Sequence, residues 1–123
     1  MKFMLLCYDD EAEWQRRGEA ALKAAMEEAV QLTHELSAKG HYMIASPLES
    51  VTAAKSVRVR DGKTLVTDGP FAETREQLGG FYLIEAKDQD EAIAIAARHS
   101  GARLGTVEVR PIFELPGLPP SKY

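Results

Sequence analysis

The alternation of apolar and polar residues predicts a sheet protein with two substantial helices. Residues 3–7 and 81–84 are continuous apolar runs. Such runs are typical of strands covered on both faces, so we expect these two to lie side by side in the middle of a sheet. Over residues 19–39 the apolar positions recur every three or four residues, which predicts an amphipathic helix that ends before Gly40. Its inward stripe is expected to contain Leu22, Met26, Ala29, Thr33 and Leu36.

Shorter elements complete the predicted sheet. Residues 41–46 predict another strand. Asp61 and Gly62 separate two alternating segments, which is the strongest short-range hairpin signal, so residues 57–67 predict an inserted hairpin. Residues 106–113 alternate apolar and charged positions and include a proline. Because proline cannot donate a hydrogen bond within a central strand, this last segment is expected at the edge of the sheet.

Acidic residues mark the expected helix starts. Asp9 or Asp10 can cap a short helix near the N-terminus. Asp88 is followed three residues later by Glu91, a pattern that resembles a capping box and predicts a helix running to His99. His99 would then lie near a helix C-terminus, where a positive charge is favourable.

The predicted order is strand, helix, strand, inserted hairpin, strand, helix, strand. Right-handed crossovers turn this order into an α+β fold, a ferredoxin-like split βαβ sheet with an inserted β-hairpin and both helices on one face. The other face would stay uncovered, because a single domain has nothing more to place on it. We therefore expect a homodimer in which two sheets pack face to face about a two-fold axis.

Composition indicates one ordinary globular domain. The chain has 123 residues, of which 45% are hydrophobic and 28% are charged, and this length is enough for a modest core. Lys and Arg number 15 against 19 Asp and Glu, a net charge of −4 without a basic stripe, so we expect no nucleic-acid partner. We find no signal peptide and no apolar run of membrane-spanning length. The expectation is a cytoplasmic protein with no membrane partner.

Metal and thiol chemistry have little support in the sequence. His34, His41 and His99 lie on separate predicted elements and show no ligand spacing. We therefore expect no metal and no other cofactor. Cys7 lies within the first apolar run and has no second cysteine to pair with, so it is expected to be a small core residue.

A dense turn lies in residues 67–85, TDGPFAETREQLGGFYLIE. Asp68 is followed by Gly69 and Pro70; glycine permits backbone conformations that other residues resist, and proline fixes its own φ. Two such residues behind an acid favour a carboxylate held at a defined place. In the alternative interpretation, Asp68 only accepts hydrogen bonds from the N–H groups of its own turn, as aspartate commonly does.

Six polar residues are candidates for a site on one face of the sheet. A carboxylate inside a partly closed apolar barrel loses hydration, so its pKa rises toward the range useful for acid or base catalysis. Nearby arginines would oppose this shift and hold an anionic substrate group instead. Alternatively, the acids and arginines form only a structural ion-pair network. The candidates are Asp68 for catalysis and Glu73, Arg58, Arg110, Tyr8 and Tyr82 for substrate binding.

Residues 68–80, DGPFAETREQLGG, resemble the motif of the DGPF branch of the YCII-related family. The family domain is expected over residues 1–115, which leaves residues 116–123 as a C-terminal tail containing Pro and Gly. The resemblance implies a dimeric α/β barrel. It also implies an aspartate acting with a histidine from the first helix on small aromatic or lactone-like molecules, as is thought for some members. Asp68 is the candidate aspartate, but no histidine matches, since His34 falls more than a turn away.

These patterns predict a small-molecule-binding domain of the YCII type. One hypothesis is a cofactor-free lyase or isomerase in which Asp68 is the general acid or base. A second is a ligand-binding module that performs no chemistry. A third comes only from the resemblance: DGPF proteins resemble those often encoded beside extracytoplasmic-function sigma factors, which implies a regulatory partner. The sequence supports the first two about equally and identifies no substrate.

Overall fold

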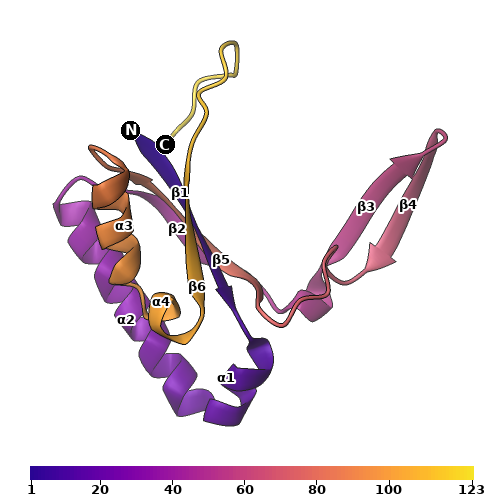
Figure 1. Cartoon of the computed structure of the whole chain (residues 1–123), viewed down its shortest axis with the longest axis horizontal. Helices are drawn as coiled ribbons and strands as arrows, with labels where there is room; N and C mark the ends of the chain where they lie inside the picture. The colour runs from indigo at the N-terminus through magenta and orange to yellow at the C-terminus, as the bar shows by residue number, and fades with distance from the viewer.

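The computed structural model describes all residues 1–123 and confirms a mixed α+β fold (Figure 1). The chain runs through a strand, two helices, a strand, a hairpin, a strand, two helices and a last strand. The strands are β1 (Lys2–Asp9), β2 (Tyr42–Pro47), β3 (Lys55–Arg60), β4 (Lys63–Asp68), β5 (Gln77–Glu85) and β6 (Thr106–Pro111). The helices are α1 (Glu11–Arg17), α2 (Glu19–Ala38), α3 (Gln89–Ala97) and α4 (Ser100–Leu104), with a short 3₁₀ helix at Val51–Ala53.

Four strands form one antiparallel sheet in the order β2-β5-β1-β6. The two apolar strands, β1 and β5, lie at its centre as predicted, and Leu5 faces Tyr82 across the pair. The prediction of an edge strand is confirmed for β6, which ends at Pro111. Gly79 and Gly80 lie inside β5 rather than in the loop before it, because this strand begins earlier than the sequence indicated.

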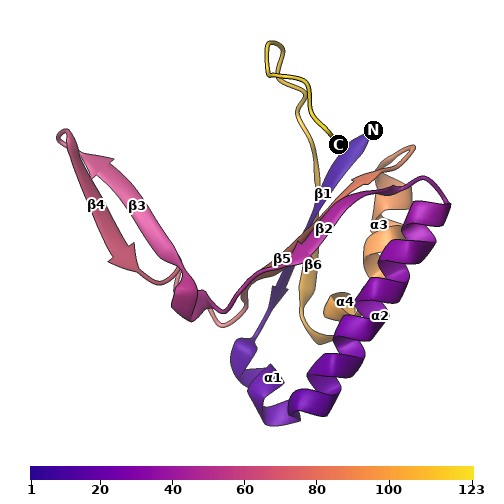
Figure 2. The ribbon, with the colours of Figure 1, turned by 180° about the vertical axis from the view of Figure 1, so that it is seen from behind.

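The core lies between the sheet and the helices that pack on one of its faces (Figures 1 and 2). Burying each large apolar side chain there stabilises the fold by roughly 1.5–3 kcal/mol. The four side chains that are completely enclosed come from β1, α2 and β5, namely Phe3, Leu5, Leu36 and Ile84.

The opposite face of the sheet is not covered by any element of this chain. Successive side chains of a strand point to opposite faces, and directly paired residues share a face. Met4 pairs with Leu83 and Leu6 pairs with Phe81, and all four side chains are half-buried. An apolar face of this kind is what the expected homodimer would cover, and the homodimer remains a prediction.

The first half of α2 departs from the predicted packing. Leu36 is buried as expected, together with Leu32. Leu22 and Met26 were expected to face the core but are 37% and 42% exposed. The physical reason is the path of the helix: α2 and β2 form a wedge that is narrow where α2 ends and wide where it begins (Figure 2).

The predicted hairpin is confirmed and forms a separate two-stranded sheet. Asp61 and Gly62 have φ angles of 50° and 72°, as a tight hairpin turn requires. The hairpin projects from the body of the molecule (Figures 1 and 2). Val57 and Val66 pair within it, and both remain exposed. We call residues 55–68 the arm.

The helical segment after β5 begins as predicted but ends differently. The Asp88 cap is confirmed, because its carboxylate accepts a hydrogen bond from the Glu91 N–H at 2.9 Å. The Glu91 carboxylate accepts from the Lys87 N–H at 2.9 Å instead of from the Asp88 N–H, so the predicted capping box is formed only in part. His99 does lie just past a helix C-terminus, but the prediction that the helix runs to His99 is wrong. α3 ends at Ala97, and the Nδ1 atom of His99 caps the start of α4 by accepting a hydrogen bond from the Gly101 N–H at 2.9 Å.

Candidate ligand cavity

A cavity of about 540 Å³ lies in the wedge between α1, the first half of α2 and the sheet. Of the 24 residues that line it, 12 are hydrophobic. Leu22, Met26 and Val30 are among them, so the apolar side chains in the first half of α2 form a cavity wall instead of entering the core. Cavities of this size and character are typical of small-molecule sites.

Small residues on both sides create this space. Ala25 and Ala29 of α2 line the cavity, and Gly79 and Gly80 of β5 line it from the sheet. A Cβ atom at Gly80 would lie 3.1 Å from the carbonyl oxygen of Ser46 on β2. The close approach of two strands therefore excludes a side chain at this point, and the cavity keeps its volume.

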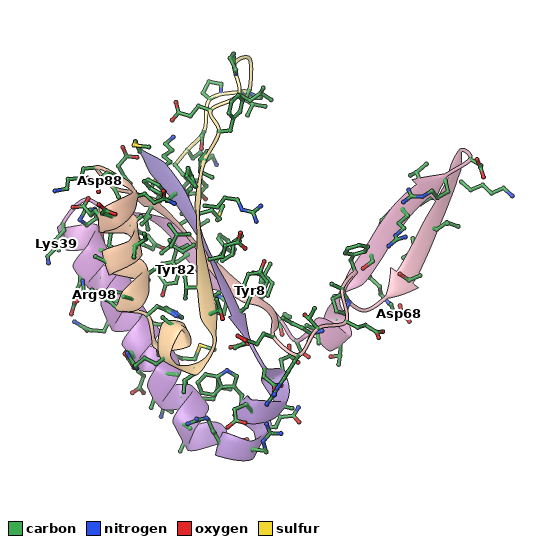
Figure 3. All side chains as sticks on the ribbon, viewed as in Figure 1. Tyr8, Lys39, Asp68, Tyr82, Asp88 and Arg98 are labelled. Atoms are coloured by element: carbon green, nitrogen blue, oxygen red, sulfur yellow. The ribbon has the colours of Figure 1, made fainter.

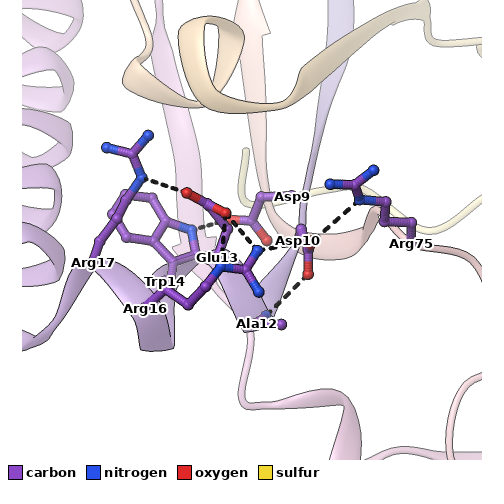
Figure 4. Close-up of polar contacts among 8 residues, drawn as sticks. All are labelled: Asp9, Asp10, Ala12, Glu13, Trp14, Arg16, Arg17 and Arg75. Atoms are coloured by element: carbon purple, nitrogen blue, oxygen red, sulfur yellow. Dashed lines mark hydrogen bonds and ion pairs between the residues drawn. The ribbon is translucent and has the colours of Figure 1, made fainter.

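The end of β1 brings a carboxylate to the cavity. Asp9 accepts a hydrogen bond from the indole N–H of Trp14 at 2.8 Å (Figure 4), and both residues line the cavity. The neighbouring Asp10 is the helix cap: it accepts from the Ala12 N–H at 3.0 Å and pairs with Arg75 at 3.4 Å. Because Asp10 caps the helix, the Asp9 carboxylate is not needed as a cap and lines the cavity instead.

Tyr82 and His99 form another part of the wall, with ring centroids 5.3 Å apart and ring planes at 77°. Burial raises the pKa of Tyr82 to about 12, so its hydroxyl keeps its proton. Burial lowers the pKa of His99 below its ordinary value, and its Nδ1 atom already accepts from Gly101. The imidazole is therefore neutral near pH 7. Burial, and then the charge of Asp9, raise the pKa of Cys7 to about 11, so its thiol is not a nucleophile.

Comparison with known proteins establishes the family. A family model described as YCII-related domain matches residues 1–116. This chain belongs to the YCII-related family. It is also similar to an uncharacterized protein of Rhizobium meliloti (strain 1021), with 37% identity over 114 residues that cover 91% of this chain and 92% of that protein.

In this YCII-related domain, the arm carries Asp68 away from the cavity (Figure 3). The Asp68 side chain is 86% exposed and forms an ion pair with Lys55, so it faces a neighbouring strand instead of its own turn. Arg58 lies over the ring of Phe71, with 4.9 Å between the guanidinium carbon and the ring centroid. The catalytic role of Asp68 stays a prediction.

The other sequence candidates lie in three different places. Glu73 is exposed in the connection between β4 and β5. Arg110 is paired with Met4 across the strands, which places it on the uncovered face of the sheet, where it forms an ion pair with Glu108. Tyr8 is half-buried near the end of β1. Only Tyr82 among the six candidates lines the cavity.

Three cavity residues were missed as site candidates in the sequence. Asp9 was considered only as a helix cap, Trp14 lies on a short helix, and His99 was assigned to a helix end. One available signal was the second acid directly after an apolar strand, because one helix start needs only one cap. No group of three or more His, Cys, Asp or Glu side chains lies close enough together to hold a metal ion, and none of the helices has the length and apolarity to cross a membrane.

Proposed function

We propose that this YCII-related domain binds a small molecule in the cavity between α2 and the sheet. The observation that carries the proposal is that apolar side chains in the first half of α2 face a cavity. Leu22, Met26 and Val30 face a cavity of about 540 Å³ instead of the core. Apolar surface left uncovered forgoes roughly 25 cal/mol per Å² of burial, so a ligand that fills the cavity recovers this stabilisation.

The binding proposal is tested by filling the cavity from within. Ala29→Phe places a ring in the cavity, and Ala24→Phe places the same ring on an exposed position of the same helix outside it. The probe is 4-tert-butylbenzyl alcohol, a compact apolar molecule. We expect it to raise the melting temperature of the native protein and of Ala24→Phe but not of Ala29→Phe, because only a ligand that binds the native state stabilises it. An equal rise in all three proteins would contradict the proposal, as would the absence of a rise in any of them with both the alcohol and the amine of the same shape, 4-tert-butylbenzylamine.

We further infer membership of the DGPF branch from the motif over residues 68–80. As an enzyme, the protein would be a cofactor-free lyase or isomerase. Asp68 lies outside the cavity of its own chain. It can therefore serve as the acid or base of such an enzyme only where the arm of one chain approaches the cavity of another chain. Within one chain, the candidate acid or base groups are the carboxylates that line the cavity, Asp9 and Glu11, because the Nδ1 atom of His99 already accepts from Gly101.

The homodimer proposal rests on the uncovered face of the sheet. Leu6 and Phe81 pair at its centre and remain half-buried without any covering element. Light scattering at micromolar concentration is expected to give a dimer mass for the native chain and a monomer mass for Leu6→Arg. A monomer mass for the native chain would refute the sheet-to-sheet dimer.

A regulatory partner is the second candidate function, and exposed aromatic residues away from that sheet face favour it. Phe71 and Phe113 are 76% and 81% exposed, and this role requires them to belong to contiguous apolar patches, since single exposed apolar side chains are ordinary on protein surfaces. This role does not need the cavity. A protein that functions as a partner alone would show no difference between Ala29→Phe and Ala24→Phe in any ligand assay.

A further inference from the structure

The charged residues that line the cavity are all acidic. Among the residues that line it, Asp9 and Glu11 carry carboxylates, and there is no lysine or arginine. The one titratable base in the wall, His99, has its pKa lowered by burial and is neutral near pH 7. Arg58 and Arg110, which were expected to hold an anionic group, do not line the cavity.

The carboxylates of Glu11 and Asp9 differ in the number of hydrogen bonds that they accept. Glu11 accepts hydrogen bonds from the Ser50 hydroxyl at 2.9 Å and from the Val51 N–H at 2.8 Å, so it holds the connection after β2 in place. Asp9 receives only the indole N–H of Trp14, and it forms no ion pair. One carboxylate of the cavity therefore has unused acceptor capacity.

The Asp9 carboxylate packs directly against Gly79. Its Oδ1 atom would lie only 3.0 Å from a Cβ atom built there, so glycine at this position lets the carboxylate keep its place in the cavity wall. Asp10, one residue further, is unlike it, because Arg75 at 3.4 Å and Arg16 at 4.0 Å compensate its charge (Figure 4). The uncompensated charge is the one that faces the cavity.

Electrostatics then discriminate between ligands. An anion placed beside Asp9 would be desolvated without a counter-charge and repelled, which is costly in a partly buried site. A protonated amine would form a charge-assisted hydrogen bond with the same carboxylate. Aromatic side chains such as Trp14 and Tyr82, which also line the cavity, favour cations through their ring electrons.

We propose that the ligand of this cavity is an apolar molecule bearing a protonated amine, with the ammonium group at Asp9 and the apolar body along the α2 stripe. The proposal rests on the proposed binding function and names the class of ligand for the same cavity. Anionic acids and lactone carboxylates are excluded from this class by the charge of the wall.

The experiment uses three compounds of one shape and different charge: 4-tert-butylbenzylamine, 4-tert-butylbenzyl alcohol and 4-tert-butylbenzoate. Calorimetry measures their affinities for the full chain near neutral pH. The NMR signal of the Trp14 indole N–H reports binding beside Asp9, because the chain has one tryptophan. We expect the amine to bind at least about tenfold more tightly than the benzoate, with the alcohol between them.

Asp9→Asn keeps the shape of the side chain and an acceptor for the indole while removing the charge. In this variant the amine should bind no more tightly than the alcohol. The affinity of the alcohol should differ from its affinity for the native protein by less than about twofold. The matched control is Asp10→Asn, which keeps a good helix cap and lies outside the cavity; it should leave the order of affinities unchanged.

The outcomes separate the two proposals. Benzoate binding as tightly as the amine, or an amine preference that survives Asp9→Asn, would overturn the ligand class while leaving a binding cavity. Binding of none of the three compounds would instead overturn the binding function, and the ligand class with it.

Discussion

Gly105 is the point at which a single methyl group should disturb both the fold and the cavity. A Cβ atom there would lie 2.2 Å from the carbonyl oxygen of Tyr8 and 3.2 Å from the Cα atom of Asp9. Real Cβ atoms essentially never approach other atoms below 3.0 Å, so the two segments would have to separate by about 0.8 Å. The end of β1, which carries Asp9, would move with them.

The expected cost of Gly105→Ala is about 2–3 kcal/mol, since overpacking against backbone cannot be relieved by a change of rotamer. For a domain of this size, that cost corresponds to a fall in melting temperature of about 6–15 °C. Scanning calorimetry measures the fall, and the indole N–H signal of Trp14 should shift because its acceptor, Asp9, is displaced.

Glu114→Ala is the control for this substitution. Glu114 is exposed, lies after the last strand and does not have a positive φ, so its replacement should leave the melting temperature and the indole signal nearly unchanged. A melting temperature of Gly105→Ala within about 2 °C of the native value would refute the reasoning, because the contact with Tyr8 would then be relieved at no cost.

Three further outcomes are expected. Leu36→Ala should lower the free energy of unfolding by about 2–5 kcal/mol in chemical denaturation, because the side chain is completely enclosed; a loss below about 1 kcal/mol would mean that the site collapses freely. Gly69→Val should lower the melting temperature more than Asp68→Asn, since Gly69 has a φ of 91° whereas Asp68 makes only an exposed ion pair; equal values would argue against a strained turn. The folded-state pKa of His99 lies below its ordinary value, so stability present above that ordinary value should be lost as pH falls toward the folded pKa. Glu28, Arg103 and Asp9 act on this pKa together with burial, and His99→Gln should remove this part of the pH dependence of denaturation, so an unchanged profile would contradict the assignment.

Local sequence patterns were sufficient for most elements of secondary structure. The Asp61-Gly62 turn and the helix cap at Asp88 were identified correctly. Each depends on backbone conformation and hydrogen bonds within a few residues, so neighbouring residues contain the information. The central position of β1 and β5 also followed from their composition, because a strand with two apolar faces needs cover on both sides.

The periodicity of α2 was interpreted only in part. It shows which residues share a face of the helix, but not what that face meets. Leu36 meets the core, whereas Leu22 and Met26 meet a cavity, because the helix and the sheet diverge. The angle of a helix on a sheet depends on side chains from several elements, and the small residues Ala25 and Gly80 on the facing surfaces leave the wedge open.

The pattern of residues was enough to predict the fold class and, through the motif over residues 68–80, the family to which the chain belongs. Which polar groups lie together became known only from the folded structure. Asp68 stands in the most conspicuous turn of the chain, yet it lies on the arm, while Asp9 and His99, 90 positions apart, line one cavity. The physical reason is that a site is assembled by contacts between distant segments, and these are set by strand order and helix packing, which no local pattern of residues specifies.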